Sequence, residues 1–594
     1  MTANYQKYYL AELAFLREMG HEFAAAYPEV GHMLAEQGSD PDVERLLEGV
    51  AFLTAQVRQK LDDEFPEIVY SLTDLIFPEY LRPIPASSIL QFTPLPNLLR
   101  DRQRIPRGTE VGSVPVEGTP CRFRTTQDVD VLPLTLEQVA VELPQATGAE
   151  LRLSFKLQSG AKLGTVDLRE LRLHLMPGAQ AGTATALYLW LCRRARGVVL
   201  RKRGSKPGAG GGIRLPPSVL HPAGLGNEEA LLPSAPNALG GYRVLQEFYT
   251  LPAKFLSVRV SGLERLSELG PETGFDLVIE LTEPLPGSLR LTPENLALYC
   301  TPVINVFAHD ADPIALEHDQ TEYRVRPAGP DARHYAVYSV ERVSGWVQGW
   351  SEKRNYEPLL SFRRGVESGA GAYYTKRLKP AVVGSGSELY VSFSLPVARD
   401  TTLPAEVITI ELLCSNRRLP TQLRVGDISV PTAATPPIVT FKNLTTPTLP
   451  VEPPLGGDLH WRLLAHLNLS YRTLADAEAL RDVLHLYNFQ ALVDRQAARA
   501  NQIRLQGIKR WQTHPTDRLL RGAAIRGVRF EAELDEDAFA DEGELYLFAA
   551  LLNEVLAAQT SLNTFTELVV TAAQARNRYE FAPRSGHVAI GGIR

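Results

Sequence analysis

Hydrophobic residues recur every three or four positions between residues 43 and 65. The series is Val43, Leu46, Leu47, Val50, Leu53, Val57, Leu61 and Phe65. This spacing gathers side chains on one side of an α-helix. Asp40 and Pro41 supply a start signal for the helix, and Pro66 supplies a stop. A similar series from Tyr5 to Tyr27 predicts that two long amphipathic helices open the chain, followed by a short one over residues 67–77.

Three consecutive carboxylates, Asp62, Asp63 and Glu64, end the second helix. Adjacent helical residues point about 100° apart, so the three side chains cannot converge on one cation or one reacting bond. We interpret them as the polar end of a structural helix. The apolar stripe beside them predicts either core residues or a surface that packs against other subunits. Its members are Leu46, Val50, Leu53, Val57, Leu61 and Phe65.

After Pro85 the pattern alternates between apolar and polar residues, which predicts half-buried β-strands. Helical spacing returns near the C-terminal end, together with one further strand. These patterns predict a multidomain α+β protein with N-terminal amphipathic helices, β-rich middle domains and a mixed C-terminal domain. The clearest strands are "ELRLSFKLQ" from Glu150, "LRLHLM" from Leu171, "ELYVSFSLP" from Glu388, "EVITIELLC" from Glu406 and "GVRFEAEL" from Gly527.

The length of 594 residues implies several cores. The proline-rich segment "TTPTLPVEPPLGGD", residues 445–458, predicts an extended linker. The long connection of residues 216–241 is rich in Pro, Gly and Asn and suggests a surface arm or a partner contact. We therefore predict a helical region, two β-rich domains and a C-terminal mixed α/β domain. Their predicted ranges are residues 1–82, 83–300, 301–450 and 451–594.

Composition narrows the class of protein. Hydrophobic residues make up 44% and charged residues 22%, which are ordinary globular values. A net charge of −6 argues against nucleic-acid binding. The four cysteines are far apart, so neither a zinc ribbon nor a disulfide framework is predicted. We see neither a secretory signal nor an apolar run long enough to span a bilayer, so we expect a soluble protein in the cytoplasm.

Short catalytic signatures such as GxSxG, GxxxxGK[ST] and HExxH do not occur. "GAGGG" at residues 208–212 has no helix after it and predicts a hairpin tip rather than a nucleotide-binding turn. The basic run of residues 193–206 lacks interleaved aromatic residues, which favours a solvated hairpin. We therefore predict no catalytic residue and no cofactor.

One loop contains groups that could bind a divalent metal. Its candidates are His309, Asp310, Asp312, Glu317, His318 and Asp319. The alternative function would be a metal-dependent enzyme that uses His309, Asp310 and Asp312. Aspartates before a proline more often cap turn N–H groups, so we favour a structural loop.

Several long segments resemble one family in the same order. They include "DPDVERLLEGVAFLTAQVRQKLDDEFPEIVYSLTDLIFPEYLRPIP" from Asp40, "GYRVLQEFYTLPAKFLSVRVSGL" from Gly241, "LYCTPVINVFAHDADPI" from Leu298 and "LHWRLLAHLNLSYRTL" from Leu459. The resemblance is to the TssF family, also called VasA or ImpG, of the bacterial type VI secretion system. It departs near "LYLFAALLNEVLAAQTSLNTF", where the family helix is usually richer in Gly and Phe.

The resemblance implies a structural role and no enzymatic activity. Family members are baseplate wedge subunits of this contractile injection system, similar in role to phage wedge proteins. The implied partners are TssG, a second copy of the chain, TssK, TssE, neighbouring wedges and the VgrG hub, on which sheath and tube assemble. The implied location is a cytoplasmic baseplate that other subunits dock at the inner membrane, without membrane insertion of this chain.

Overall fold

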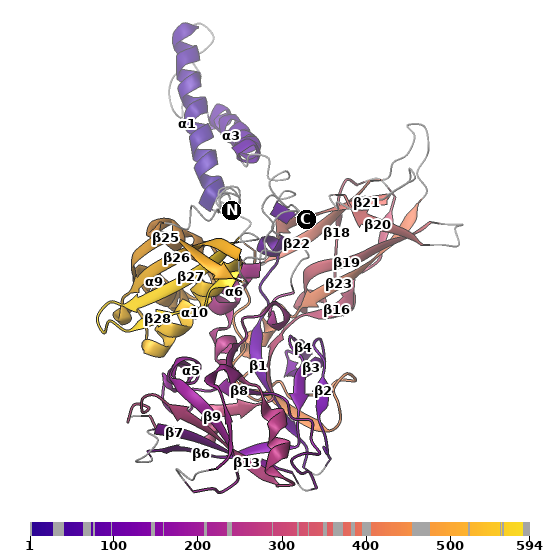
Figure 1. Cartoon of the computed structure of the whole chain (residues 1–594). Coiled ribbons are helices and arrows are strands. Elements are labelled where there is room, and N and C mark those ends of the chain that lie inside the picture. Colours follow the sequence, from indigo (N-terminus) through magenta and orange to yellow (C-terminus); the bar gives the residue numbers. More distant parts are fainter. Residues whose placement is uncertain are drawn as a thin grey trace. The chain divides into compact units, whose positions relative to one another are not determined.

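The structure is a computed structural model of the whole chain, shown in Figure 1. It separates into two compact units, residues 1–75 with 456–460, and residues 76–455 with 461–594. In its described part, no helix is both long enough and apolar enough to cross a bilayer. The structure describes residues 3–585 except 28–40, 63–72, 75–77, 97, 144–148, 159, 207–210, 234–239, 288, 318–319, 331, 348–352, 360–371, 382–385, 395–404, 454–475, 521–522, 559 and 561–563.

The first unit contains the two predicted long helices, α1 (Ala3–Ala26) and α3 (Pro41–Asp62). They pack against each other, and an ion pair of 2.8 Å joins Arg17 to Glu44. The predicted helix of residues 67–77 lies almost wholly outside the described residues. The two long helices are therefore confirmed, and the third is left as a prediction.

A five-stranded sheet in the second unit is assembled from segments far apart in sequence. Its order is β24-β1-β15-β4-β3, and β1 pairs antiparallel with both β15 and β24. The buried ring of Phe92 meets that of Phe441 with a centroid distance of 5.9 Å. A small sheet pairs β2 (Gln103–Ile105) with β5 (Val129–Val131). The five strands are β1 (Ser87–Pro94), β3 (Glu110–Val116), β4 (Thr119–Thr125), β15 (Cys300–Ile304) and β24 (Val439–Asn443).

Two antiparallel sheets follow, with orders β10-β9-β13-β7-β6 and β11-β12-β8-β14. Helices α5 (Thr183–Arg193) and α6 (Gly240–Thr250) belong to the same region. The strands are β6 (Leu134–Glu142), β7 (Ala149–Leu157), β8 (Leu171–Leu175), β9 (Ala195–Lys202), β10 (Ile213–Leu215), β11 (Leu220–Ala223), β12 (Ser257–Val260), β13 (Gly274–Leu281) and β14 (Leu296–Leu298).

Residues 307–415 form a separate sheet of order β16-β23-β19-β20-β21-β22-β18, with β17 beside β23. An isolated bridge between Ala311 and Pro327 connects the first and last edges, so the sheet closes into a barrel. Phe307, Tyr356 and Ile410 belong to its core. The strands are β16 (Phe307–Asp310), β17 (Ile314–Leu316), β18 (Tyr323–Arg324), β19 (Ala336–Val347), β20 (Arg354–Pro358), β21 (Ala372–Pro380), β22 (Ser387–Ser394) and β23 (Glu406–Ser415).

The C-terminal part is mixed α/β. Strands β26 and β27 are parallel, and helix α10 (Glu542–Ala558) connects them and is buried along most of its length. Gly543 allows a close approach, because an added Cβ would lie 2.1 Å from the carbonyl oxygen of Thr185 in α5. The remaining elements are α8 (Ala477–Leu486), α9 (Arg495–Gln506), β25 (Ile508–Leu520), β26 (Ala523–Leu534), β27 (Phe565–Ala572), β28 (Arg578–Glu580) and β29 (Arg584–Ser585).

All five quoted strands are present, but the expected half-burial is wrong for β7. Arg152 and Ser154 are almost as buried as the apolar residues between them. Arg152 is covered because it pairs with Glu142 and Asp276 across the sheet. Charged side chains can line a buried sheet face when neighbouring strands supply their partners.

The predicted arm and linker also differ from expectation. Residues 220–232 of the arm pack against the protein, and Ala223, Leu231 and Leu232 are buried. The described start of the linker, residues 445–453, runs along β1, where Thr448 N donates to the Ser87 carbonyl at 2.9 Å. Proline-rich composition indicates an extended backbone, and here that backbone is held by hydrogen bonds to a neighbouring strand.

Candidate assembly face and buried charged clusters

The apolar stripe of α3 is exposed. Its four described side chains are Leu46 at 70%, Val50 at 46%, Leu53 at 62% and Val57 at 58% of their full exposure. These residues are spaced by four, three and four positions, so they project from one side of the helix. Exposed apolar residues that form one continuous stripe, unlike scattered ones, indicate an interaction surface.

The opposite side of α3 is the buried one. Ala51 and Ala55 are fully buried, and at about 100° per residue they lie roughly 150° around the helix from the stripe. In the described part of the first unit, the four stripe residues are therefore exposed rather than packed in the contact between α1 and α3. The side chain of Leu61 and all of Phe65 lie outside the described residues.

The described residues of the candidate metal loop make separate contacts and do not face one common site. His309 Nε2 lies 2.8 Å from the carbonyl oxygen of Ala328, and its ring packs edge-on to Tyr335 at 5.0 Å. Asp310 and Asp312 are exposed, while His318 and Asp319 lie outside the described residues. Within the described part of the chain, no group of three His, Cys, Asp or Glu residues is arranged to hold a metal ion.

A buried carboxylate that sequence reasoning missed is Glu229, in the 3-10 helix η3 (Asn227–Glu229). It pairs with Arg172 of β8 and, at 2.9 Å, with Arg259 of β12. It also accepts the backbone N–H groups of Gly224 and Gly226. Burial works against the charge, but the two arginines and the N–H groups outweigh it, so the pKa of Glu229 is lowered. This network holds the predicted arm against two strands.

A second buried carboxylate, Glu247 of α6, lies nearby in the fold. It accepts from the backbone N–H groups of Leu231 and Leu232, at 2.8 and 3.1 Å, and pairs with Lys254. Lys254 belongs to the 3-10 helix η4 (Pro252–Phe255) and is itself fully buried. Burial lowers the pKa of Lys254, and Glu247 partly offsets that effect. The two carboxylates together fix residues 224–232.

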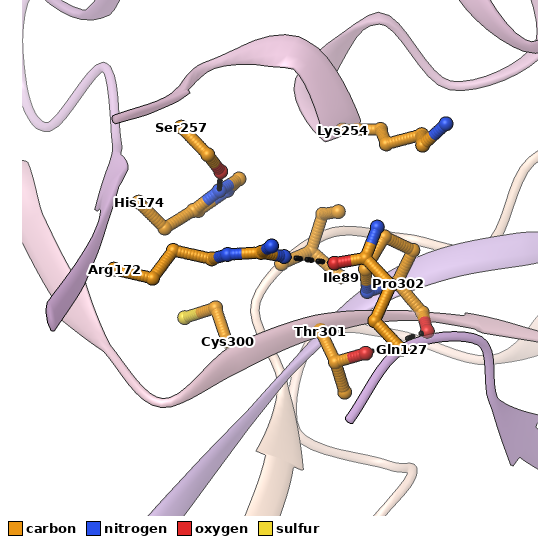
Figure 2. A pocket seen from close by; sticks show the side chains of 9 residues that line it. All are labelled: Ile89, Gln127, Arg172, His174, Lys254, Ser257, Cys300, Thr301 and Pro302. Atoms are coloured by element: carbon orange, nitrogen blue, oxygen red, sulfur yellow. Dashed lines mark hydrogen bonds between the residues drawn. The ribbon is translucent and has the colours of Figure 1, made fainter. Parts of the chain in front are cut away.

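A small cavity lies beside these clusters (Figure 2). Its volume of about 10 Å³ is space for roughly one water molecule, and two of its lining residues, Arg172 and Gln127, are hydrogen-bonded to each other. His174 Nδ1 lies 2.9 Å from Ser257 Oγ, while Lys254 extends away from this pair. Burial, reinforced by the positive charge of Arg172, lowers the pKa of His174 to about 4. A cavity of this size does not admit an organic substrate.

Three of the cysteines, Cys121, Cys300 and Cys414, are buried, and Cys192 is partly buried. Burial raises the pKa of Cys121 to about 11 and that of Cys414 to about 12. The pKa values of Cys192 and Cys300 are also raised by burial. A thiol attacks as its thiolate, and these four stay protonated near neutral pH. The described residues thus define a multidomain α+β protein with buried charge pairs and an exposed apolar face on α3.

Comparison with known proteins identifies the family within this class. The family described as "Type VI secretion system, TssF" matches residues 1–588. The "Type VI secretion system component TssF1" of Pseudomonas aeruginosa is 31% identical over 626 residues, which cover 97% of each chain. The chain belongs to the TssF family.

Two solved structures are similar over nearly the whole chain. One, described as a TssK-TssF-TssG baseplate subcomplex of the type VI secretion system revealed by cryo-electron microscopy, matches with a TM-score of 0.74 and 31% identity. The match covers 92% of this chain and 100% of the other. The second, "The baseplate complex from the type VI secretion system", matches with a TM-score of 0.63 and 26% identity. It covers 99% of this chain and 100% of the other.

Proposed function

We propose that this chain is a wedge subunit of a type VI secretion baseplate and binds TssG and TssK. The observation that carries the proposal is the match, over 92% of this chain, to a chain solved in a TssK-TssF-TssG subcomplex. In the proposed assembly, two copies of this chain join TssG, and TssK and TssE complete the wedge. Wedges then surround a VgrG hub, in a cytoplasmic baseplate that other subunits dock at the inner membrane.

The proposed role is conformational. Contacts between subunits would hold the wedges in one arrangement until a trigger rearranges them, and sheath and tube would assemble on the same platform. Nothing in this role requires a substrate, which fits the one-water cavity and the protonated cysteines of the described residues.

The stripe on α3 is the proposed assembly face. Full burial of a large apolar side chain contributes roughly 2 kcal/mol. Leu46, Val50, Leu53 and Val57 keep about half or more of their exposure, so covering all four would contribute about 5 kcal/mol before the costs of association. That magnitude is enough to decide whether a partner helix stays bound.

The test is co-expression of this chain with TssG and TssK, followed by purification through a tag on TssG. We expect a discrete complex that contains more than one copy of this chain. Leu53→Glu should remove the chain from the complex, because the new carboxylate would be buried without a partner at a cost of several kcal/mol. Since Leu53 is largely exposed in the isolated chain, circular dichroism should show unchanged folding.

Gln56→Glu is the matched control. It adds the same charge at an exposed position of the same helix, about 90° around from the stripe, and should leave the complex intact. A parent chain that never co-purifies with TssG would overturn the proposed function. Co-purification that survives Leu53→Glu would instead leave the function standing and refute α3 as the assembly face.

A further inference from the structure

The barrel of residues 307–415 is an insertion in the five-stranded sheet β24-β1-β15-β4-β3, which we call the central sheet. The chain enters it from β15 through residues 305–306 and leaves it from β23 through residues 416–418. Two single-stranded crossings of this kind leave a domain free to rock unless other contacts hold it. The barrel is held at these crossings and also by side contacts, such as the one of 2.7 Å between Thr119 Oγ1 of β4 and His334 Nδ1. The contacts at the crossings decide whether the barrel can hinge where the chain enters and leaves it.

The two crossings are tied to each other by a pair of asparagines, Asn305 and Asn416, both completely buried. Asn305 Nδ2 donates to Asn416 Oδ1 at 2.8 Å, and the backbone N–H of Asn416 donates to Asn305 Oδ1 at 2.7 Å. The entry and exit of the barrel are thus joined by a reciprocal pair of hydrogen bonds.

A third segment, β4 of the central sheet, completes the joint. The backbone N–H of Arg122 donates to Asn416 Oδ1 at 3.1 Å, and the Arg122 carbonyl accepts from Asn305 Nδ2 at 2.8 Å. Both amide orientations follow from these contacts, because each Oδ1 faces a backbone N–H that can only donate. The side chains of Asn305 and Asn416 therefore join the two crossings to each other and to strand β4.

Further contacts extend from this joint into the barrel. The guanidinium of Arg122 binds Glu110 through two bonds of 2.8 Å and lies over the ring of Phe307, with its central carbon 4.7 Å from the centroid. Phe307 belongs to the barrel core. Arg417, which follows Asn416, has a left-handed φ of 51°, a conformation that the surrounding structure must stabilise.

We propose that Asn305 and Asn416 form a lock that makes the barrel and the central sheet one mechanical body. Asparagine suits position 305 because its side chain offers a donor and an acceptor in one plane. At position 416 the amide oxygen alone joins two segments, because it accepts from both Asn305 Nδ2 and Arg122 N. The lock lets a force applied to the barrel reach the central sheet without bending at the crossings. This inference rests on the geometry of the joint and is independent of the proposed function.

The test is hydrogen exchange of the full-length chain, read by mass spectrometry, for Asn305→Leu and Asn416→Leu. Leucine keeps the approximate volume and removes every side-chain hydrogen bond. We expect exchange at residues 303–307 and 414–418 to rise by about tenfold or more. Exchange in the barrel strands β19 and β22 should stay at the parent rate, because the barrel core is untouched.

Asn443→Leu is the matched control. Asn443 is equally buried and makes four hydrogen bonds, all to residues 424–445 of the central sheet and its loops. It should leave exchange at both crossings unchanged. Unchanged exchange at the crossings of both leucine variants would refute the lock. Equal loss of protection in β19 and β22 would also refute it, since the pair would then support the barrel fold and not the joint.

A charge-matched pair keeps the test decisive if the leucine variants do not fold. Asn416→Asp retains an acceptor for Arg122 N and Asn305 Nδ2, whereas Asn305→Asp loses both donated bonds and points a carboxylate oxygen at two acceptors. The crossings should therefore open several-fold more in Asn305→Asp. Equal opening in the two variants would contradict the hydrogen-bonded lock.

Discussion

Lowering the pH from about 7 to about 5 should loosen the region around His174. This side chain is 2% exposed, and burial together with Arg172 lowers its pKa from 6.5 to about 4. In the unfolded chain His174 therefore gains a proton below about pH 6.5, whereas in the folded protein it stays neutral until the pH falls to about 4. The contribution of neutral His174 to the free energy of unfolding is full above about pH 6.5. It decreases as the pH falls from about 6.5 to about 4, and it is constant at lower pH.

The size of the effect follows from the two pKa values. At about pH 5 the unfolded state gains roughly a 30-fold statistical advantage from protonation, equivalent to about 2 kcal/mol. Glu229, whose pKa is lowered from 4.5, contributes little at about pH 5, because its stabilising effect begins to fall only near the pKa of an unfolded glutamate. The predicted loss is therefore centred on β8 and β12, which carry His174 and Ser257.

Hydrogen exchange at about pH 7 and about pH 5, corrected for intrinsic rates, measures this loss directly. Amides in residues 171–175 and 257–260 should lose about 30-fold protection in the parent. His174→Asn is the control, because an asparagine can keep the bond to Ser257 and does not titrate. Equal losses in parent and control would refute a role for His174.

Two further substitutions test the packing described above. Glu229→Ala should lower the urea midpoint, with a loss of about 2 kcal/mol, because it leaves the partly buried Arg172 without its carboxylate. Arg265→Ala removes an exposed ion pair and should leave the urea midpoint unchanged. Gly543→Ala should cost about 1–3 kcal/mol, because the new methyl group would meet the Thr185 backbone. A thermal midpoint equal to that of the parent would show that α5 and α10 can separate without cost.

The sequence predicted those elements whose signal is local. The alternation over residues 151–157 and the helical spacing of α3 were enough, because side-chain period reflects backbone geometry directly. The apolar stripe of α3 was also predicted, but the sequence did not show which side of that helix packs against the rest of the chain. The buried side of that helix consists of Ala51 and Ala55, and small residues give a weak signal when large apolar side chains are counted.

The buried clusters could not be predicted from the sequence. Arg172 and His174 are two positions apart in a short strand, which hints at a shared polar face. Their partners are remote, however: Gln127 is 45 residues and Glu229 is 57 residues from Arg172. Only the tertiary fold brings these groups together, and no local pattern distinguishes a buried ion pair from a solvated one.

The central sheet also constrains the order in which the protein can fold during synthesis. Strand β1 pairs with β24, which is made roughly 350 residues later, a delay of about 20 to 70 s at ordinary rates of translation. Until then Ile89, Leu90 and Phe92 of β1, all buried in the finished protein, have no lasting cover from that side. The barrel is complete before β24 emerges, so we expect it to form first on the ribosome. The nascent chain should then depend on a chaperone that shields β1.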